Sequence, residues 1–173
     1  MIIRRADQGE EEQILSFYHD LIDGMRDMAF RPYWSKGVYP VLEDIRSAVE
    51  RGEMYIALED GIVGTFILNH AQADGYTRVS WPTEAAADKT AVIHLLAVSP
   101  ACQGRGVGKQ LLQKAAALCR ESGDTVIRLD TLTWNEPGHK LYTGFGFRYC
   151  GDLELTYAST GTIPFSMFEY RVR

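Results

Sequence analysis

The chain has 173 residues, 46% of them apolar, and a formal net charge of -5, which suits a globular protein with a sizeable core. An acidic chain is a poor match for a phosphate backbone, so nucleic acid is not an expected partner. The sequence shows no membrane-length apolar run and no signal peptide, so we expect a cytoplasmic protein without a membrane partner. The three cysteines form no CxxC pair, which predicts reduced thiols and no metal site.

The first 50 residues predict a strand followed by two helices. Residues 2–6 read as a short strand, and Asp7 is expected to cap a helix whose apolar residues recur at helical spacing up to Gly24. An aromatic segment of irregular structure follows at 28–40. A second helix is expected over 41–51, closed by a glycine just beyond its end.

A hairpin is predicted next. Strand-like runs at 54–59 and 62–69 flank an Asp60-Gly61 dipeptide, a combination that favours a tight hairpin turn. The polar stretch at 71–90 is harder to place. Within it, residues 76–81 either extend the second hairpin strand or line a pocket.

The second half of the chain alternates strands and helices. The apolar run 91–98 predicts a central strand, 106–122 an amphipathic helix and 125–132 a further strand, parallel to the first by the crossover rule. A short helix is expected near 137–144. Two strands complete the chain at 147–157 and 165–172, with glycine-punctuated segments around 144–146 and 159–161. Since no linker or repeat interrupts this order, we expect one domain over residues 1–173.

The segment QGRGVG, residues 103–108, lies between an expected strand and an expected helix. A P-loop would need glycine at 103 and Ser or Thr at 110, where this chain has Gln103 and Gln110. A Rossmann fingerprint would need a glycine where Lys109 stands. What remains is Gln-x-x-Gly-x-Gly, ending on Gly106 and Gly108. Free amides at a helix N-terminus favour a pyrophosphate, and the alternative is a plain tight turn.

Two segments resemble the GNAT family, the GCN5-related N-acetyltransferases. The first is IHLLAVSPACQGRGVGKQLLQKA, residues 93–115, and the second is WNEPGHKLYTGFGF, residues 134–147. The resemblance covers most of the chain and is strongest over 92–151. It implies an α/β fold of mixed α+β character, with a central, mostly antiparallel sheet, a parallel splayed strand pair and flanking helices.

The same resemblance implies acetyl-CoA, or coenzyme A, as the cofactor. The loop amides would hold its pyrophosphate beside two cationic side chains. The backbone of residues 96–98 would pair with the pantetheine arm, which needs the two central strands to splay apart after residue 98. The implied cofactor-binding residues are Leu96, Ala97, Val98, Gln103, Gly104, Arg105, Gly106, Val107, Gly108, Lys109, Asn135 and Lys140. For Lys140, an exposed helix lysine without a ligand is the alternative.

Acyl transfer from a thioester to an amine needs a proton for the leaving thiolate. Tyr142 is the candidate acid, because a phenol with a pKa of about 10 is neutral at pH 7 and can donate to a thiolate. Its place on the short helix after Asn135 fits the family. A core tyrosine on an apolar face is the alternative.

The amine also has to be neutral when it attacks, which calls for a base. His94 is the candidate, because an imidazole takes up a proton near pH 7, and regular alternation would place it on one face with Val92 and Leu96. The family's usual glutamate, where present, falls on Val92. A structural histidine, Glu84 or a water chain are the alternatives, and Asp130 is expected to form only structural hydrogen bonds. Backbone amides near residues 96–98 would polarise the carbonyl.

The acceptor is expected to meet an aromatic wall contributed by the N-terminal half and by the stretch that follows the hairpin. The candidates are Tyr33, Trp34, Tyr39, Tyr76 and Trp81. The leading interpretation is an N-acetyltransferase acting on a primary amine of a small molecule or amino acid derivative, as a monomer or homodimer. A protein or peptide acceptor and a non-catalytic acyl-CoA-binding module are the alternatives.

Overall fold

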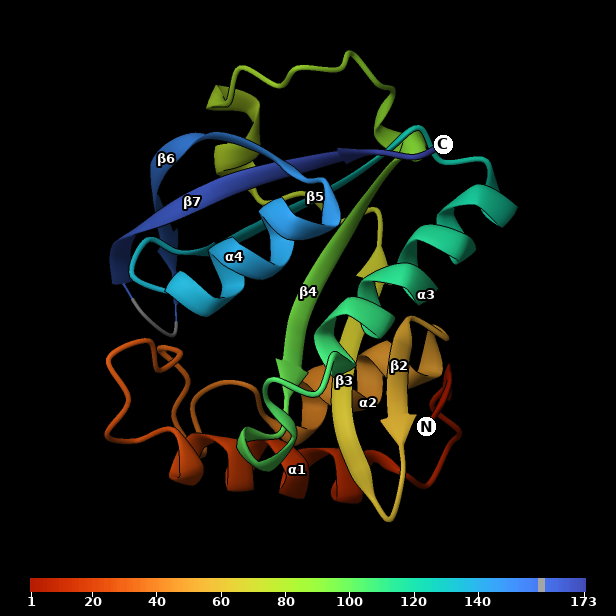
Figure 1. Ribbon diagram of the computed structural model, residues 1–173, viewed down its shortest axis with the longest axis vertical. Coiled ribbons are helices and arrows are strands. Elements are labelled where there is room, and N and C mark those ends of the chain that lie inside the picture. Colours follow the sequence, from red (N-terminus) through yellow and green to blue (C-terminus); the bar gives the residue numbers. More distant parts are fainter. Residues whose placement is uncertain (159–160) are drawn as a thin grey trace. The chain divides into compact units, whose positions relative to one another are not determined.

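The computed structural model describes residues 1–158 and 161–173, so part of the glycine-punctuated segment at 159–161 lies outside the described residues. Seven strands form one sheet in the order β1-β2-β3-β4-β5-β7-β6 (Figure 1). Strands β4 and β5 run parallel, as predicted, in a sheet that is otherwise mostly antiparallel. The chain divides into two compact units, one of residues 1–68 with 94–111 and one of residues 69–93 with 112–173.

The first unit is built on the predicted hairpin. Strand β1 pairs antiparallel with β2, and β2 pairs with β3 around the Asp60-Gly61 turn. Its elements are β1 (Ile2–Arg5), α1 (Glu11–Gly24), α2 (Leu42–Glu50), β2 (Met54–Leu58), β3 (Ile62–Asn69), the later residues of β4 (Thr90–Val98), the short turn η3 (Pro100–Cys102) and the first turn of α3 (Val107–Ser122).

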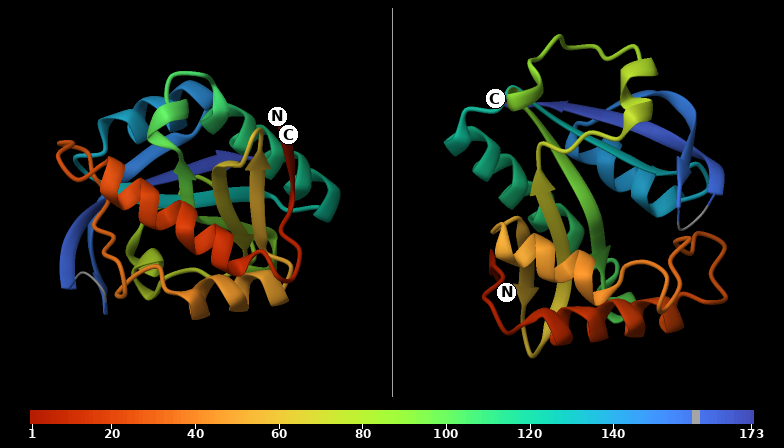
Figure 2. Two further views of the ribbon diagram at one scale, coloured as in Figure 1. Left: turned by 90° about the horizontal axis from the view of Figure 1, so that it is seen from below. Right: turned by 180° about the vertical axis from the view of Figure 1, so that it is seen from behind.

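Helices α1 and α2 cover one face of this hairpin and the start of α3 covers the other (Figures 1 and 2). The core under α1 and α2 buries Tyr18 and Ile45 together with Leu95 of β4. On the opposite face, Gly64 of β3 leaves room for Leu111 of α3, because an added Cβ would lie only 3.0 Å from its Cδ1. The second part of β4 and the start of α3 therefore rest on one scaffold.

Helix α1 starts later than the sequence predicts. Its N-cap position is held by Glu10 and its first residue is Glu11, so Asp7 is not the cap. The Glu10 carboxylate instead accepts hydrogen bonds from the Asp7 amide at 2.7 Å and from the Arg4 guanidinium at 2.6 Å. These contacts hold residues 7–10 in a turn, and the helix begins three residues later than a cap at Asp7 would set it.

The second unit is built on β5, β7 and β6, with β7 between the other two. The register of the parallel pair sets Thr90 opposite Val126 and Val92 opposite Arg128. Its elements are η1 (Asp74–Arg78), η2 (Ala87–Lys89), the first residues of β4, the rest of α3, β5 (Val126–Leu132), α4 (Glu136–Phe145), β6 (Arg148–Tyr157) and β7 (Gly161–Arg171).

Helix α4 and the turn η1 lie on opposite faces of these three strands (Figures 1 and 2). Tyr142 of α4 meets Phe168 of β7, whereas Tyr76 of η1 packs with Phe165 and Met167 of the same strand. Because Tyr76 belongs to a short helical turn, residues 76–81 do not extend the hairpin, and that alternative from the sequence is wrong.

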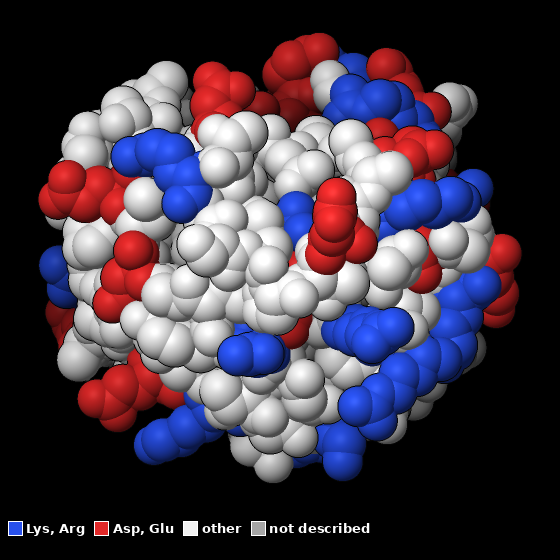
Figure 3. All heavy atoms as spheres, turned by 90° about the horizontal axis from the view of Figure 1, so that it is seen from above, with Lys and Arg blue, Asp and Glu red and all other residues white. Residues whose placement is uncertain are grey.

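Figure 3 shows acidic and basic side chains side by side on one face, with basic side chains gathered toward one edge. In the described part of the chain, no helix is both long enough and apolar enough to cross a membrane.

Candidate active site

The glycine loop, residues 103–108, follows η3 and opens α3 as predicted. Gly104 and Gly106 adopt φ angles of +77° and +82°, a region that L side chains rarely enter. No atom lies within 4 Å of the place where a Cβ would stand at either residue. The backbone conformation therefore requires these glycines, and the space beside them is not filled by the protein.

The loop also presents amides that the protein leaves free. Among the described residues, the amides of Gly104, Gly106, Val107 and Gly108 donate to no backbone carbonyl. The first amide of the helix that does so is that of Gln110, which donates to the Gly106 carbonyl at 3.2 Å. Free amides and the helix dipole together favour an anion at this position.

Two cationic side chains were expected beside this loop. Lys109 is exposed, as such a contact would need. Arg105 is exposed as well, but its guanidinium binds Glu59 at 2.9 Å and Cys102 Sγ at 3.3 Å. Its charge is therefore partly compensated by Glu59, and Lys109 is the stronger candidate for contact with a phosphate.

Strand β4 contains a break in regular geometry at Leu95. Its φ of +49° is the one positive value outside glycine in the described part of the chain. Exposure still alternates around this residue, with Leu95 and Ala97 buried and His94 and Leu96 half-buried. The irregular backbone at Leu95 comes before Val98, whereas the sequence analysis expected the two central strands to separate only after residue 98.

Helix α4 is capped by Asn135. Its side-chain oxygen accepts a hydrogen bond from the Gly138 amide at 3.1 Å, and its amide nitrogen donates to Thr131 Oγ1 of β5 at 2.8 Å. Asn135 thus fixes the start of α4 against β5. The cofactor contact that the resemblance implies for it stays a prediction, as does that of Lys140, which is exposed on the same helix.

Tyr142 is packed into the face of α4 that meets the sheet. Its ring lies 5.5 Å from that of Phe168 and 5.8 Å from that of Phe147, and the residue is 6% exposed. Its hydroxyl has no hydrogen-bond partner among the described residues. Burial, and then the negative charge of Asp130, raise the pKa of Tyr142 well above its usual value. The phenol therefore stays protonated at neutral pH and keeps one donor unused.

The aromatic residues proposed for the acceptor divide between the two units. Trp34 and Tyr39 pack against the core of the first unit, and Tyr33 is 51% exposed. In the second unit Tyr76 is buried, and Trp81 donates through Nε1 to the Tyr76 carbonyl at 2.9 Å. Most of these rings take part in the packing of their own unit.

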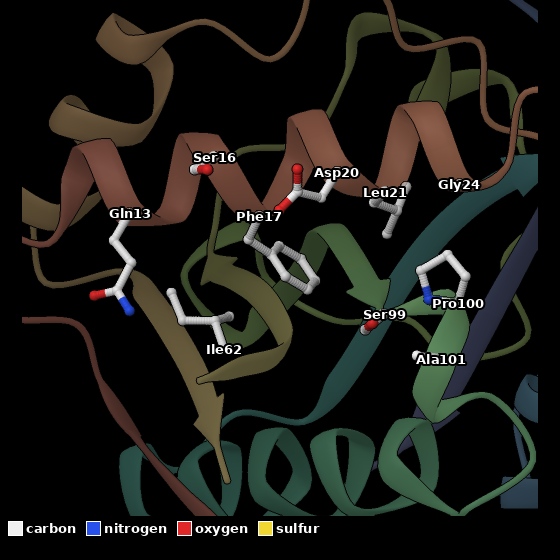
Figure 4. Close-up of a pocket in the computed structure, with 10 residues that line it drawn as sticks. All are labelled: Gln13, Ser16, Phe17, Asp20, Leu21, Gly24, Ile62, Ser99, Pro100 and Ala101. Carbon is white, nitrogen blue, oxygen red and sulfur yellow. The ribbon is translucent and has the colours of Figure 1, made fainter. Parts of the chain in front are cut away.

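A hollow of about 410 Å³ lies in the first unit between α1 and the turn after β4 (Figure 4). In the close-up, Phe17 and Leu21 of α1 point toward Ser99. The remaining lining residues are Gln13, Ser16, Asp20, Gly24, Ile62, Pro100 and Ala101. None of the site residues predicted from the sequence lines it.

A sequence profile of the acetyltransferase (GNAT) family matches residues 18–147, from α1 to the end of α4. The chain belongs to the GNAT family. The matched range contains the glycine loop, the irregular strand β4 and the Asn135-capped helix with Tyr142. Both segments on which the resemblance rested therefore lie inside the family match.

Named GNAT relatives match part of the chain. Streptothricin acetyltransferase from Streptomyces lavendulae is 30% identical over 106 residues, which cover 60% of this chain and 54% of the relative. The N-alpha-acetyltransferase RimI from Mycobacterium tuberculosis is 32% identical over 75 residues, which cover 43% and 46%. The chain thus spans about half the length of these relatives.

Solved GNAT structures match the whole chain. An acetyltransferase from Streptococcus agalactiae superposes with a TM-score of 0.81 at 19% identity, covering 99% of this chain and 95% of that one. YncA from Salmonella typhimurium, solved with its cofactor acetyl-CoA, has a TM-score of 0.73 at 18% identity, covering 100% and 94%. These likenesses confirm the fold expected from the sequence.

Two side chains were expected from the sequence as candidates for the general base of this GNAT chain. His94 lies half-buried in the second part of β4, and Glu84 is exposed in the segment between η1 and η2, so both stay predictions. The sequence analysis gave Asp130 only structural hydrogen bonds. Its side chain accepts them from Tyr76 at 2.8 Å and Tyr157 at 3.2 Å. Because those partners lie far away in the sequence, no local sequence pattern could have predicted these hydrogen bonds.

Proposed function

We propose that this GNAT chain is an acetyl-CoA-dependent N-acetyltransferase that acts on a primary amine of a small molecule or amino acid derivative. The observation that carries the proposal is the glycine loop. It combines left-handed glycines, open space beside them and free amides at the start of α3. The structure of a GNAT protein with bound acetyl-CoA, YncA, supports the choice of donor.

The residues of the chain fit this donor by their chemistry. When bound, acetyl-CoA supplies an activated thioester. The amides of residues 103–108 bind its pyrophosphate, and the backbone of residues 96–98 pairs with the pantetheine arm and polarises the carbonyl. The hydroxyl of Tyr142, which is protonated and has no partner among the described residues, donates to the sulfur as it leaves.

The names of the relatives support two kinds of acceptor. One is a streptothricin acetyltransferase and the other an N-alpha-acetyltransferase. A small-molecule amine is the first candidate here and the N-terminus of a protein or peptide the second. A cytoplasmic location and a monomeric or homodimeric state, both expected from the sequence, are part of the same proposal.

A thiol-release assay tests the proposed function. Purified protein is incubated with acetyl-CoA and each of a set of small primary amines, amino acid derivatives and peptides with free N-termini. The products are checked by mass spectrometry for one added acetyl group. We expect release of coenzyme A with at least one small amine. Tight binding of coenzyme A without turnover on any amine would instead identify a non-catalytic binding module.

A further inference from the structure

The hollow between α1 and the turn after β4 takes no part in the proposed acyl transfer. Its volume of about 410 Å³ lies within the range of small-ligand sites. Its lining residues come from α1, from the first residue of β3 and from residues 99–101, all of which belong to the first unit. The hollow is therefore a candidate binding site inside one compact unit, and these residues define its chemistry.

The base of the hollow is apolar. Phe17 and Leu21 of α1 are almost fully buried, and Ile62 and Pro100 are half-buried. At one end the helix meets the turn closely, because a Cβ built on Gly24 would lie 3.1 Å from Cγ of Pro100. The hollow thus offers carbon surface to the apolar part of a ligand, and the close contact at Gly24 limits the space at that end.

Polar side chains complete the lining, namely Gln13, Ser16, Asp20 and Ser99. The three from α1 recur at helical spacing and therefore lie along one side of the helix. Figure 4 shows Gln13 extending from α1 toward Ile62. In the described part of the chain none of the four forms a side-chain hydrogen bond or a salt bridge. They keep their hydrogen-bonding capacity for a ligand.

Asp20 supplies the only charge among the residues that line the hollow. Asp23, one turn of helix further on, forms salt bridges with Arg26 and Lys36, whereas Asp20 has no cationic partner among the described residues. The last turn of α1 holds no basic side chain, and the helix ends at Gly24, which also lines the hollow. The negative end of the helix dipole therefore adds to the charge of Asp20, and both favour a cation.

We propose that this hollow binds a small organic cation, with its ammonium group at the Asp20 carboxylate and its hydrocarbon part against Phe17 and Leu21. The hydroxyl oxygens of Ser16 and Ser99 can accept further hydrogen bonds from the ammonium. The ligand class is accordingly a protonated amine with an apolar body. This binding needs neither acetyl-CoA nor acyl transfer, so the inference does not depend on the proposed function.

The wall of the hollow opposite α1 is fixed by backbone hydrogen bonds. The Ser99 amide donates to the Val63 carbonyl of β3 at 2.9 Å, and the Ser99 carbonyl accepts from the Cys102 amide at 2.8 Å. The glycine loop begins only after this turn, and none of its residues lines the hollow. We therefore expect a preformed site that can be occupied together with coenzyme A.

The first test uses N,N-dimethylbenzylamine, which is cationic at neutral pH and keeps one N–H donor. As a tertiary amine it has no amine hydrogen to exchange for an acetyl group, so it is not an acceptor. N,N-dimethylbenzamide is the neutral counterpart. In an NMR titration of the full chain we expect a Kd of about 1 mM for the cation, with shifts at Phe17 and Ser99, and about fivefold weaker binding of the amide. Equal affinities, or no saturable binding of the cation, would overturn the proposal.

D20N tests the charge of the hollow. It keeps the size of the side chain and should weaken the binding of the cation by about fivefold, with little effect on the amide. E12Q is the matched control, because Glu12 is an exposed carboxylate of the same helix that does not line the hollow. An equal loss in E12Q and D20N would assign the effect to net charge and refute the site.

S16L tests the space. Its larger side chain occupies part of the hollow and should weaken the binding of both compounds, and unchanged binding of the cation would place it elsewhere on the molecule. Repeating the titration with saturating coenzyme A should leave the Kd of the cation unchanged. Displacement by coenzyme A would mean that the compound occupies the cofactor site, and the inference would be wrong. A chain that binds the cation in this way but acetylates no amine would refute the proposed function alone.

Discussion

The Tyr18 hydroxyl donates a 2.8 Å hydrogen bond to the carbonyl oxygen of Leu95, the residue with the left-handed backbone in β4. The same hydroxyl accepts a hydrogen bond from Thr65 Oγ1 at 2.8 Å, and both Tyr18 and Thr65 are fully buried. A leucine at positive φ is unfavourable and persists only where its surroundings hold it. Helix α1 and strand β3 together supply that support, just before the residues proposed to pair with the pantetheine arm.

Y18F should therefore weaken both the fold and the cofactor site. The change leaves the Leu95 carbonyl and the Thr65 hydroxyl buried without their partner, which costs about 1–3 kcal/mol of unfolding free energy. We also expect a higher KM for acetyl-CoA, because the Leu95 carbonyl is no longer held. Urea unfolding and steady-state kinetics measure the two effects. Y55F is the control, since Tyr55 only accepts a long 3.4 Å contact from Arg5, and equal behaviour of the two variants would refute the argument.

G106A tests the glycine loop. Its φ of +82° makes any Cβ strained, at a cost of about 1–3 kcal/mol, and the methyl group enters the open space proposed for the pyrophosphate. G37A carries a comparable strain at φ +73°, also with nothing within 4 Å, but lies outside the loop. Calorimetric titration with coenzyme A should show about a tenfold or greater loss of affinity for G106A alone. Comparable losses in both variants would attribute the effect to general destabilisation.

Y142F tests the leaving-group acid. The tyrosine ring packs on Phe147 and Phe168, and its hydroxyl has no partner among the described residues, so phenylalanine keeps the packing and the stability. We expect kcat to fall by about 100-fold with little change in the affinity for coenzyme A. Y149F is a suitable control, since Tyr149 is half exposed on β6. A kcat for Y142F close to that of wild type would exclude the proposed acid.

Much of the fold follows from local signals in the sequence. The Asp60-Gly61 turn gives the hairpin, and the helix between 91–98 and 125–132 requires those strands to be parallel. Asn135 caps a helix at the expected place, with Gly146 in a left-handed conformation at its end. These features depend on residues that are close together in the sequence, so they can be predicted from the sequence alone.

The features that the sequence did not predict depend on partners that are distant in the chain. The backbone of Leu95 is held by Tyr18, 77 residues earlier, and Asp130 is held by Tyr76 and Tyr157, 54 and 27 residues away. The positive φ of Leu95 could not be predicted from the strand-like run 91–98, because the hydroxyl that holds its carbonyl comes from helix α1. Leu95 and Asp130 therefore add most to the description of the site, and both are held by residues that the sequence alone does not identify as their neighbours.

Arg128 should anchor the segment between β3 and β4. It joins Glu169 of β7 to Gln72 and to the Thr83 carbonyl, and both side chains of the ion pair are almost fully buried. R128L leaves the Glu169 carboxylate buried and unpaired, so we expect a loss of about 3–5 kcal/mol. The double variant R128L/E169L should recover much of it in urea unfolding. A double variant less stable than R128L would refute this argument, because removing the unpaired Glu169 carboxylate would then restore no stability.

The pH dependence of stability provides a test of the environment of Asp130. Its folded-state pKa is raised, so between the ordinary carboxyl value of about 4 and that higher value the folded chain binds more protons than the unfolded chain. This group therefore stabilises the fold most at low pH, and its contribution falls as pH rises through that interval. D130N keeps an acceptor for Tyr76 and Tyr157 but cannot ionise, so its stability relative to wild type should increase with pH. Urea unfolding of both proteins from pH 4 to 8 measures the difference, and D152N, which changes an exposed carboxylate, should show no such trend. A stability of D130N that instead falls relative to wild type as pH rises would mean that the fold favours the ionised carboxylate, the opposite of what its desolvation requires.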